Sequence, residues 1–383
     1  MRTATLGPEQ RAGALAKMAE RELDVLVVGA GVVGAGTALD AATRGLSTGI
    51  VEARDWASGT SSRSSKLIHG GLRYLEMLDF VLVREALKER GLLLQRLAPH
   101  LVKPVPFLYP LQHKGWERFY AGSGVALYDA MSLSSGHGRG LPGHRHLTRR
   151  HALRVAPCLK RDALVGALQY YDAQMDDARY VATLVRTASA YGAYAANRAR
   201  VTGFLREGER VVGARVRDLE QGGEFEVRAK QVVNATGVWT DDTQQLIAER
   251  GQFHVRASKG IHLVVPKDRI NSTTGLILRT EKSVLFVIPW GGTGSSAPRT
   301  PTGTWTRRTR RRPARTSTTC WSTSTRCCRC RSRATTWRAS TPVCGRCSRA
   351  SRTPPASCPA STPWPTRCRG WWSSRAASTR RTG

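Results

Sequence analysis

The last 91 residues of this 383-residue chain, Thr293 to Gly383, contain no acidic residue and no large aliphatic residue except Val343. Lys, His, Asn, Gln, Phe and Tyr are absent as well, so that Thr, Ser, Pro, Ala, Arg, Gly, Cys and Trp make up the rest. Such a segment has little apolar area to bury against a backbone ordering cost of about 1–2 kcal/mol per residue. We therefore expect residues 293–383 to be an unfolded tail.

Cysteine is scarce before this tail. Cys158 is the only cysteine in residues 1–292, which excludes a disulfide framework there and favours a reducing cytoplasm. Long apolar runs are scarce too, because glycines interrupt the run LDVLVVGAGVVGAG well short of the roughly 20 residues of a membrane-spanning helix. The first 22 residues are charged and lack the apolar centre of a secretory signal. The expected location is the cytoplasm, with peripheral attachment to the inner face of the membrane as a further option.

The eight residue types of the tail share one property in the genetic code, since each is encoded with C or G as the middle base. In a gene with G or C at nearly every third codon position, a reading frame that starts one base late moves those bases into the middle. We therefore hypothesise that residues 293–383 are a frameshifted reading of a longer coding region. Leucine codons that end in TG, read one base late, give codons that begin with TG and encode Cys or Trp, so we predict no metal site from the spacing of the eight tail cysteines.

The formal net charge of +32 is divided unequally along the chain. The tail holds 20 Arg, whereas residues 1–292 carry 40 basic and 28 acidic residues. The alternative interpretation of the tail is an Arg-rich nucleic-acid-binding extension, because clustered basic residues neutralise phosphates and tryptophans stack on bases. Such extensions usually contain Lys, Gly-rich repeats or acids, which the tail lacks, so we expect no nucleic-acid partner.

An apolar run, a glycine-rich turn, a helix-like stretch and a second apolar run ending in an acid follow one another between Asp24 and Glu52. Gly29 permits the tight turn, Gly31 lets the backbone approach a pyrophosphate, and Gly34 lets helix and strand pack closely. The helix N-terminus offers N–H groups to the phosphates, and Glu52 lies where a ribose hydroxyl would be held. This pattern predicts a bound dinucleotide.

The residues after Glu52 favour FAD over NAD, because they are rich in Ser and Gly and place small side chains and N–H groups beside a diphosphate and a flavin. The stretch TSSRSSKLIHGGLRYLE at 60–76 resembles the flavin-side motif of the FAD-dependent, aerobic-type glycerol-3-phosphate dehydrogenases, within the glycine/D-amino-acid-oxidase-like flavoproteins. Similar segments follow as YDAQMDDAR, VVNATGVWTD, SKGIHLVVP and VLFVIPW. The resemblance covers about residues 20–292.

The tail also permits segments that resemble this family when the last base of each codon is taken with the first two of the next. Residues 334–349 then permit DDVEGVYAGLRPLL, and residues 371–383 permit VVVAGGKYTTYR, in the order in which family members carry them. The resemblance places a phosphate-binding Arg and a cofactor-closing Lys and Thr in these segments. Because this chain lacks them, we expect the chain itself to be inactive.

The resemblance implies FAD as cofactor, sn-glycerol 3-phosphate as substrate, and a membrane quinone, oxygen or a soluble carrier as electron acceptor. Besides the glycine turn and Glu52, the cofactor-binding residues that it implies are Thr60, Ser61, Ser65, Lys66, Leu67, Ala235 and Gly237.

Four residues are candidates for the substrate side of the flavin. Arg73 presents donors in a fixed plane to the phosphate or hydroxyl, with the Tyr74 phenol beside it, although an ion pair with Glu76 is the alternative for Arg73. The resemblance places His262 in the active site, where a neutral imidazole can take the hydroxyl proton as the hydride leaves. His69 is the competing base, with a structural role in the flavin loop as its alternative.

Together, periodicity and resemblance predict an α/β fold: a doubly wound, Rossmann-like FAD-binding domain built from separated segments, plus a mixed or antiparallel substrate sheet. The expected strands are 23–28, 47–52, 199–205, 211–218, 223–228 and 230–235, and the expected helices are 33–44, 79–97 and 176–191. The expected domains are an N-terminal helical extension (1–22), the FAD-binding domain with inserted substrate-side segments (23–252), the start of a truncated substrate-binding domain (253–292) and the tail (293–383).

The predicted function is oxidation of sn-glycerol 3-phosphate to dihydroxyacetone phosphate by hydride transfer to FAD. The alternatives are an amino-acid or hydroxy-acid oxidoreductase of the same flavoprotein group, and a nucleic-acid-binding protein that uses the Arg-rich tail.

Overall fold

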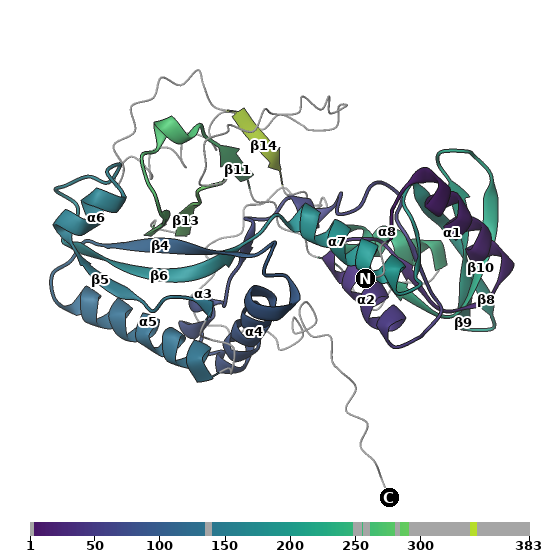
Figure 1. The fold of residues 1–383 in the computed structure, drawn as a ribbon, viewed down its shortest axis with the longest axis horizontal. Coiled ribbons are helices and arrows are strands. Elements are labelled where there is room, and N and C mark those ends of the chain that lie inside the picture. Colours follow the sequence, from purple (N-terminus) through teal and green to yellow (C-terminus); the bar gives the residue numbers. More distant parts are fainter. Residues whose placement is uncertain are drawn as a thin grey trace, which may run out of the picture. The chain divides into compact units, whose positions relative to one another are not determined.

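The computed structural model describes residues 4–134, 140–247, 255, 261–279, 284–290 and 338–342. Within these ranges the chain forms two larger sheets with helices packed on them and one pair of short strands (Figure 1). The fold is α/β, as predicted. Apart from residues 338–342, the tail that was expected to be unfolded lies outside the described residues.

The first sheet contains the predicted dinucleotide-binding unit, and its strand order is β7-β2-β1-β10-β9-β8. Strands β7, β2, β1 and β10 are parallel neighbours, while β10, β9 and β8 form an antiparallel meander. Val28 at the end of β1 lies opposite both Val51 and Asn234, so three strand ends from distant parts of the sequence meet at one edge. The strands are β1 (Leu23–Val28), β2 (Thr48–Val51), β7 (Tyr194–Ala196), β8 (Ala199–Glu207), β9 (Arg210–Asp218) and β10 (Glu224–Asn234).

Strand β10 corrects one prediction, because the sequence pattern gives two strands, 223–228 and 230–235, where the structure has one. The first part of β10 is antiparallel to β9, with Arg228 opposite Gly213. The second part is parallel to β1, beginning with Ala229 opposite Leu23. No turn residue separates the two parts, so a single strand joins the meander to the parallel strands.

Helices cover the two faces of the parallel strands. Helices α2 and α7 pack against the face that carries Val27 and Ile50. Helix α1 and the meander pack against the opposite face, which carries Leu26. Both predicted helices, 33–44 and 176–191, are confirmed as α2 and α7 with small differences at their ends. The helices of this part are α1 (Pro8–Glu20), α2 (Val32–Thr43), α7 (Asp177–Ala190), α8 (Thr240–Gln244) and the 3-10 turns η1 (Thr60–Ser62), η4 (Gly237–Trp239) and η5 (Gln245–Ile247).

Helix α1 is anchored to this sheet through its core and through an ion pair. Met18 is fully buried. Arg11 is also buried, and its guanidinium donates to Asp218 Oδ1 at 2.5 Å and to the Asn197 carbonyl oxygen at 2.9 Å. The helix predicted within residues 1–22 therefore completes one face of the first sheet.

The second sheet is mixed, in agreement with the predicted substrate sheet. Its order is β13-β12-β4-β6-β3, and β5 pairs with β6. Strands β4 and β6 are antiparallel along nine residue pairs, whereas β12 is parallel to β4. The strands are β3 (Leu67–Ile68), β4 (Lys103–Leu111), β5 (Arg145–Thr148), β6 (Gly166–Gln174), β12 (Gly275–Arg279) and β13 (Val284–Val287).

Helices α4 and α5 pack beside this sheet, around a core that includes Leu87, Phe107 and Tyr128. The helix predicted for residues 79–97 is confirmed, since Asp79 caps α4 by accepting the N–H of Leu82 at 3.2 Å. The helix ends in one π-helical segment, η2. The helices of this part are α3 (Leu72–Leu75), α4 (Phe80–Leu92), η2 (Leu93–Leu97), α5 (Trp116–Ser134), α6 (Arg149–Val155) and the 3-10 turn η6 (Lys267–Arg269).

The remaining two strands form a separate pair. Strand β11 (Ile261–Val264) is antiparallel to β14 (Arg338–Pro342), with His262 opposite Ser340. The tail thus supplies one described strand.

Candidate functional site

The glycine-rich turn between β1 and α2 has the backbone geometry that the motif predicts. Gly29 has a φ of +101° and lies against the end of β10, since a Cβ there would stand 2.7 Å from the Ala235 carbonyl oxygen. At Gly34 a Cβ would stand 1.9 Å from the Gly29 carbonyl oxygen. A larger residue at either position requires the backbone to move, so the two glycines let β1, β10 and α2 approach closely.

Glu52 braces this turn with both carboxylate oxygens. Its Oε2 accepts the N–H of Ala30 at 2.9 Å, and its Oε1 accepts the N–H of Arg54 at 2.9 Å. Each carboxylate oxygen has a second acceptor position, so these bonds leave acceptor capacity for a ribose hydroxyl. The acid that follows β2 therefore fixes the shape of the turn as well as fitting the predicted contact with the cofactor.

The N-terminus of α2 is capped from another segment. Gly31 precedes the helix and has no side chain to cap it, but Ser61 Oγ accepts the N–H of Val32 at 2.9 Å. Ser61 therefore ties the predicted flavin-side loop to the positive end of a 12-residue helix, where a phosphate is favoured. These residues fit a dinucleotide diphosphate, and their direct contacts with FAD stay a prediction.

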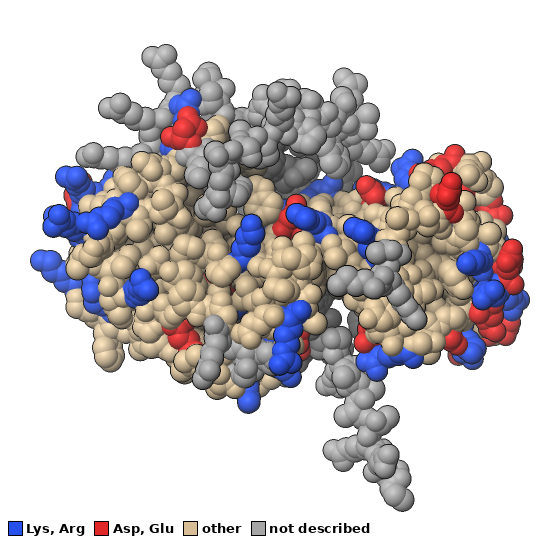
Figure 2. All heavy atoms as spheres, viewed as in Figure 1, with Lys and Arg blue, Asp and Glu red and all other residues tan. Residues whose placement is uncertain are grey.

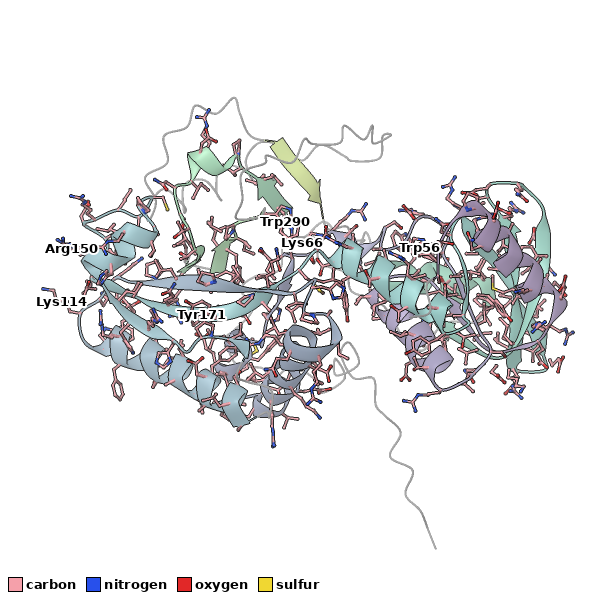
Figure 3. All side chains as sticks on the ribbon, viewed as in Figure 1. Trp56, Lys66, Lys114, Arg150, Tyr171 and Trp290 are labelled. Atoms are coloured by element: carbon pink, nitrogen blue, oxygen red, sulfur yellow. The ribbon has the colours of Figure 1, made fainter. Side chains whose placement is uncertain are left out.

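The contact of Lys66 with the cofactor stays a prediction, and the structure shows how protein groups hold this residue. Its backbone has a φ of +63°, which is uncommon for a residue with a side chain. Its ammonium donates to the Ser62 carbonyl oxygen at 3.1 Å and lies 3.5 Å from Asp177 Oδ2. It also lies over the Trp290 ring, 5.7 Å from the centroid (Figure 3). Lys66 thus connects the flavin-side loop, the start of α7 and the end of the VLFVIPW segment.

Asp177, the first residue of α7, was not among the predicted site residues. Ser64 Oγ donates to its carboxylate, and Lys66 lies beside it. Burial raises the pKa of Asp177, while these two partners act in the opposite direction. Two acids at the start of a predicted helix are the signal in the sequence that could have indicated this contact. They can pair with the Ser and Lys side chains of the flavin motif. Of the other predicted loop residues, Thr60 and Ser65 are exposed and Leu67 is half-buried in β3.

The turn that follows β3 carries the candidate base His69 on its exposed side. Gly70 is buried behind it and donates its N–H to Asp172 Oδ1 at 3.1 Å. Gly71 has a φ of +81° and precedes α3, and the Tyr74 ring packs beside it, since a Cβ at Gly71 would stand 2.9 Å from Tyr74 Cδ2. His69 therefore lies just before the turn at Gly70 and Gly71, and Tyr74 lies just after it in α3.

Arg73 lies in α3 between these groups, and its side chain lies outside the described part of the chain. Glu76, its alternative partner, accepts a hydrogen bond from Arg279 at 2.8 Å. Arg279 comes from β12 and also lies over the Tyr109 ring, 5.8 Å from the centroid. The carboxylate next to α3 is thus bound by a guanidinium from the second sheet.

His262 lies on β11 and is half-buried. This strand pairs with β14, whereas His69 follows a strand of the second sheet. The structure places the two candidate bases on different sheets. Which of them faces the substrate stays a prediction.

Ala235 and Gly237 follow β10 as the sequence predicts. Ala235 donates its N–H to the Val28 carbonyl oxygen at 2.9 Å, and Gly237 adopts a φ of +61° at the start of η4. At the end of η4, the Arg54 guanidinium lies over the Trp239 ring, with Arg54 Cζ 4.7 Å from the ring centroid. This pair links the segment after β2 to η4, and sequence reasoning missed it because the two residues are far apart in the chain.

The described residues hold no group of three or more His, Cys, Asp or Glu side chains that could bind a metal ion. The tail cysteines, for which no metal site was predicted, lie outside the described residues.

Comparison with known proteins identifies the group to which this arrangement belongs. Glycerol-3-phosphate dehydrogenase 2 of Mycobacterium tuberculosis is 59% identical over 288 residues, which are 75% of this chain and 48% of that protein. The human mitochondrial glycerol-3-phosphate dehydrogenase is 41% identical over 298 residues, covering 74% of this chain and 40% of that protein. The chain spans about half the length of the curated relatives that it matches.

The structure of the Bacillus halodurans glycerol-3-phosphate dehydrogenase complexed with FAD matches with a TM-score of 0.57 and 31% identity, over 76% of this chain and 49% of that one. Residues 24–349 match the family model described as FAD dependent oxidoreductase, which extends past residue 292, where the motif resemblance ends. The glycine turn, the brace from Glu52 and these matches agree, and the chain belongs to the FAD-dependent oxidoreductase family.

Proposed function

We propose that this chain carries the flavin-binding part of an enzyme that oxidises sn-glycerol 3-phosphate to dihydroxyacetone phosphate. The observation that carries the proposal is the 59% identity to a mycobacterial glycerol-3-phosphate dehydrogenase, together with the match to an FAD-bound dehydrogenase structure. The intact turn at Gly29 and its brace at Glu52 support retention of the cofactor site.

In this reaction, FAD supplies the acceptor for the hydride that leaves C2 of the substrate. The residues of this chain bind the substrate and take the proton of its 2-hydroxyl group. Arg73 is proposed to hold the phosphate or a hydroxyl, because a guanidinium offers several donors in one plane. Tyr74, which is 37% exposed, presents a phenol on the same short helix. His262 is proposed as the base that takes the hydroxyl proton, with His69 as the competing candidate.

A second part of the proposal concerns the tail. We propose that residues 293–383 are a frameshifted reading, that the chain itself is inactive, and that the in-frame enzyme continues beyond residue 292. The restricted residue alphabet supports this, as does exposed apolar surface near the break: Val264, Phe286 and Trp290 are 58%, 48% and 54% exposed. Sequencing the gene around codons 288–296 tests it. A one-base discontinuity supports the proposal, and an unbroken frame contradicts it.

We further propose attachment to the inner face of the membrane, with a quinone as electron acceptor. No helix among the described residues combines the length and the apolarity needed to span a bilayer. Support for peripheral attachment comes from α5, where Trp116, Phe119 and Tyr120 are 64%, 80% and 54% exposed. In Figure 2, the surface in the region of α5 is largely uncharged with scattered basic groups. Co-sedimentation with anionic vesicles tests this attachment. We expect the protein to sediment with the vesicles and Phe119→Ser to stay in the supernatant.

The proposed reaction is tested with protein made from the corrected reading frame. Flavin-loaded protein is mixed without oxygen with sn-glycerol 3-phosphate, with a set of amino acids, or with a set of 2-hydroxy acids, and the flavin absorbance is followed. Rapid bleaching by glycerol 3-phosphate alone supports the proposal. Bleaching by an amino acid or a hydroxy acid instead supports the alternative oxidoreductases of the same family.

A further inference from the structure

A buried polar network lies behind the turn that carries His69. Its members come from three separate elements: Arg90 from α4, Tyr128 from α5 and Asp172 from β6, exposed by 2%, 0% and 2%. Arg90 Nη1 donates to Asp172 Oδ1 at 2.6 Å and to the Tyr128 hydroxyl at 2.8 Å. The Tyr128 hydroxyl in turn donates to Asp172 Oδ1 at 3.2 Å. Burial raises the pKa of Asp172, and the Arg90 cation opposes that shift.

The same network holds the backbone of the turn. Asp172 Oδ1 also accepts the N–H of Gly70 at 3.1 Å. A Cβ at Gly70 would stand 2.2 Å from the Tyr128 hydroxyl oxygen and 2.3 Å from Leu87 Cδ2. A larger residue at position 70 therefore requires the buried Tyr128 or Leu87 side chain to move. His69 lies close enough to Asp172 for its charge to act on that carboxyl.

The energetics favour a positioning role for these side chains. Removing two charges from water costs several kcal/mol for each ion, and apolar side chains of similar size often stabilise a core as well or better. A buried pair that also binds a backbone N–H specifies one conformation of that backbone. Here the specified segment is the turn that presents His69 and leads through Gly71 into α3.

We propose that Arg90, Tyr128 and Asp172 are positioning residues that fix the turn at residues 69–71 and the start of α3. The claim that this turn faces substrate rests on the proposed function above. The claim that the network fixes the turn concerns the protein without any ligand, so it can be tested separately.

The test is hydrogen exchange measured by mass spectrometry on the full chain without FAD or substrate. In Asp172→Asn, amides of residues 69–75 should exchange about tenfold faster, and in the milder Tyr128→Phe about threefold faster, because the turn opens locally. Ser132→Ala is the matched control, since Ser132 accepts from the other end of the Arg90 guanidinium at 3.2 Å. It should change exchange of the turn by less than about twofold.

Two further readouts separate positioning from general stability. Exchange of strand β1, at residues 23–28, should stay the same in every variant. Arg90→Lys, which keeps the cation, should protect the turn better than Arg90→Met. Unchanged exchange of residues 69–75 in both Asp172→Asn and Tyr128→Phe would overturn the proposal, as would an equal increase in the turn and in β1. If Asp172→Asn does not fold, Tyr128→Phe decides.

Discussion

Replacing Gly34 by Ala should displace the dinucleotide turn, although the same change elsewhere in α2 should be harmless. The added Cβ would stand 1.9 Å from the Gly29 carbonyl oxygen and 3.0 Å from the Gly29 carbonyl carbon. Both are backbone atoms, so no side-chain rotation relieves the contact. Gly36 provides the matched control in the same helix, because a Cβ there would meet no atom within 4 Å.

The magnitudes follow from two opposing effects. Overpacking against a fixed neighbour costs about 1–3 kcal/mol, and contact with backbone places Gly34→Ala near the upper end. The higher helix propensity of Ala returns about 1 kcal/mol, which leaves a net loss of about 2 kcal/mol. Gly36→Ala has only the propensity effect and should gain about 0.5–1 kcal/mol. The two variants should therefore differ by about 3 kcal/mol, with opposite signs relative to the parent.

Urea denaturation of the flavin-free protein, followed by circular dichroism, measures these changes. A titration with FAD, followed by quenching of its fluorescence, measures the cofactor site. We expect Gly34→Ala to weaken FAD binding about tenfold or more, because its Cβ pushes the turn out of place, and Gly36→Ala to leave it unchanged. Equal stability and equal FAD affinity in the two variants would refute the close contact between Gly34 and Gly29.

Three further predictions concern other parts of the chain. The hydrogen bond from the Arg11 guanidinium lowers the pKa of Asp218 below its ordinary 3.8. The contribution of Asp218 to the free energy of unfolding is therefore fully present above pH 3.8, and it is lost as the pH falls through the pKa of Asp218 in the folded protein. Urea midpoints of the parent should therefore fall more steeply below about pH 4 than those of Asp218→Asn, and parallel slopes would contradict this. In the in-frame enzyme, Arg73→Ala should raise the substrate concentration required and His262→Ala should slow flavin reduction, as measured by anaerobic stopped-flow absorbance; unchanged reduction at low substrate would remove both from the site. Limited proteolysis of this chain should cleave rapidly within residues 293–383, whereas a resistant fragment spanning that range would show that the tail folds.

Local sequence patterns predicted the parts of the fold that depend on neighbouring residues. The first strand, the turn at Gly29, helix α2 and Glu52 follow one another without interruption, and the structure confirms this unit. The predicted helices 79–97 and 176–191 begin at acids that cap them, because an acid before an apolar helical pattern acts on neighbouring residues.

The missed features depend on contacts between distant residues. Arg90 and Asp172 are 82 positions apart, and nothing in either neighbourhood shows that they pair. Likewise, nothing near Lys66 in the sequence shows that its ammonium lies 3.5 Å from Asp177 Oδ2. The continuous strand β10 was read as two because its neighbours change from antiparallel to parallel, which alters the burial pattern without a break in the backbone.

The central claim, that the chain belongs to an enzyme that oxidises glycerol 3-phosphate with its flavin, is tested most directly by one stoichiometric measurement. The in-frame protein is mixed without oxygen with excess sn-glycerol 3-phosphate, and the dihydroxyacetone phosphate formed is compared with the flavin reduced. We predict about one mole of product for each mole of flavin, since one hydride leaves each substrate molecule. Flavin that stays oxidised in the presence of the substrate, or reduced flavin without dihydroxyacetone phosphate, would contradict the claim.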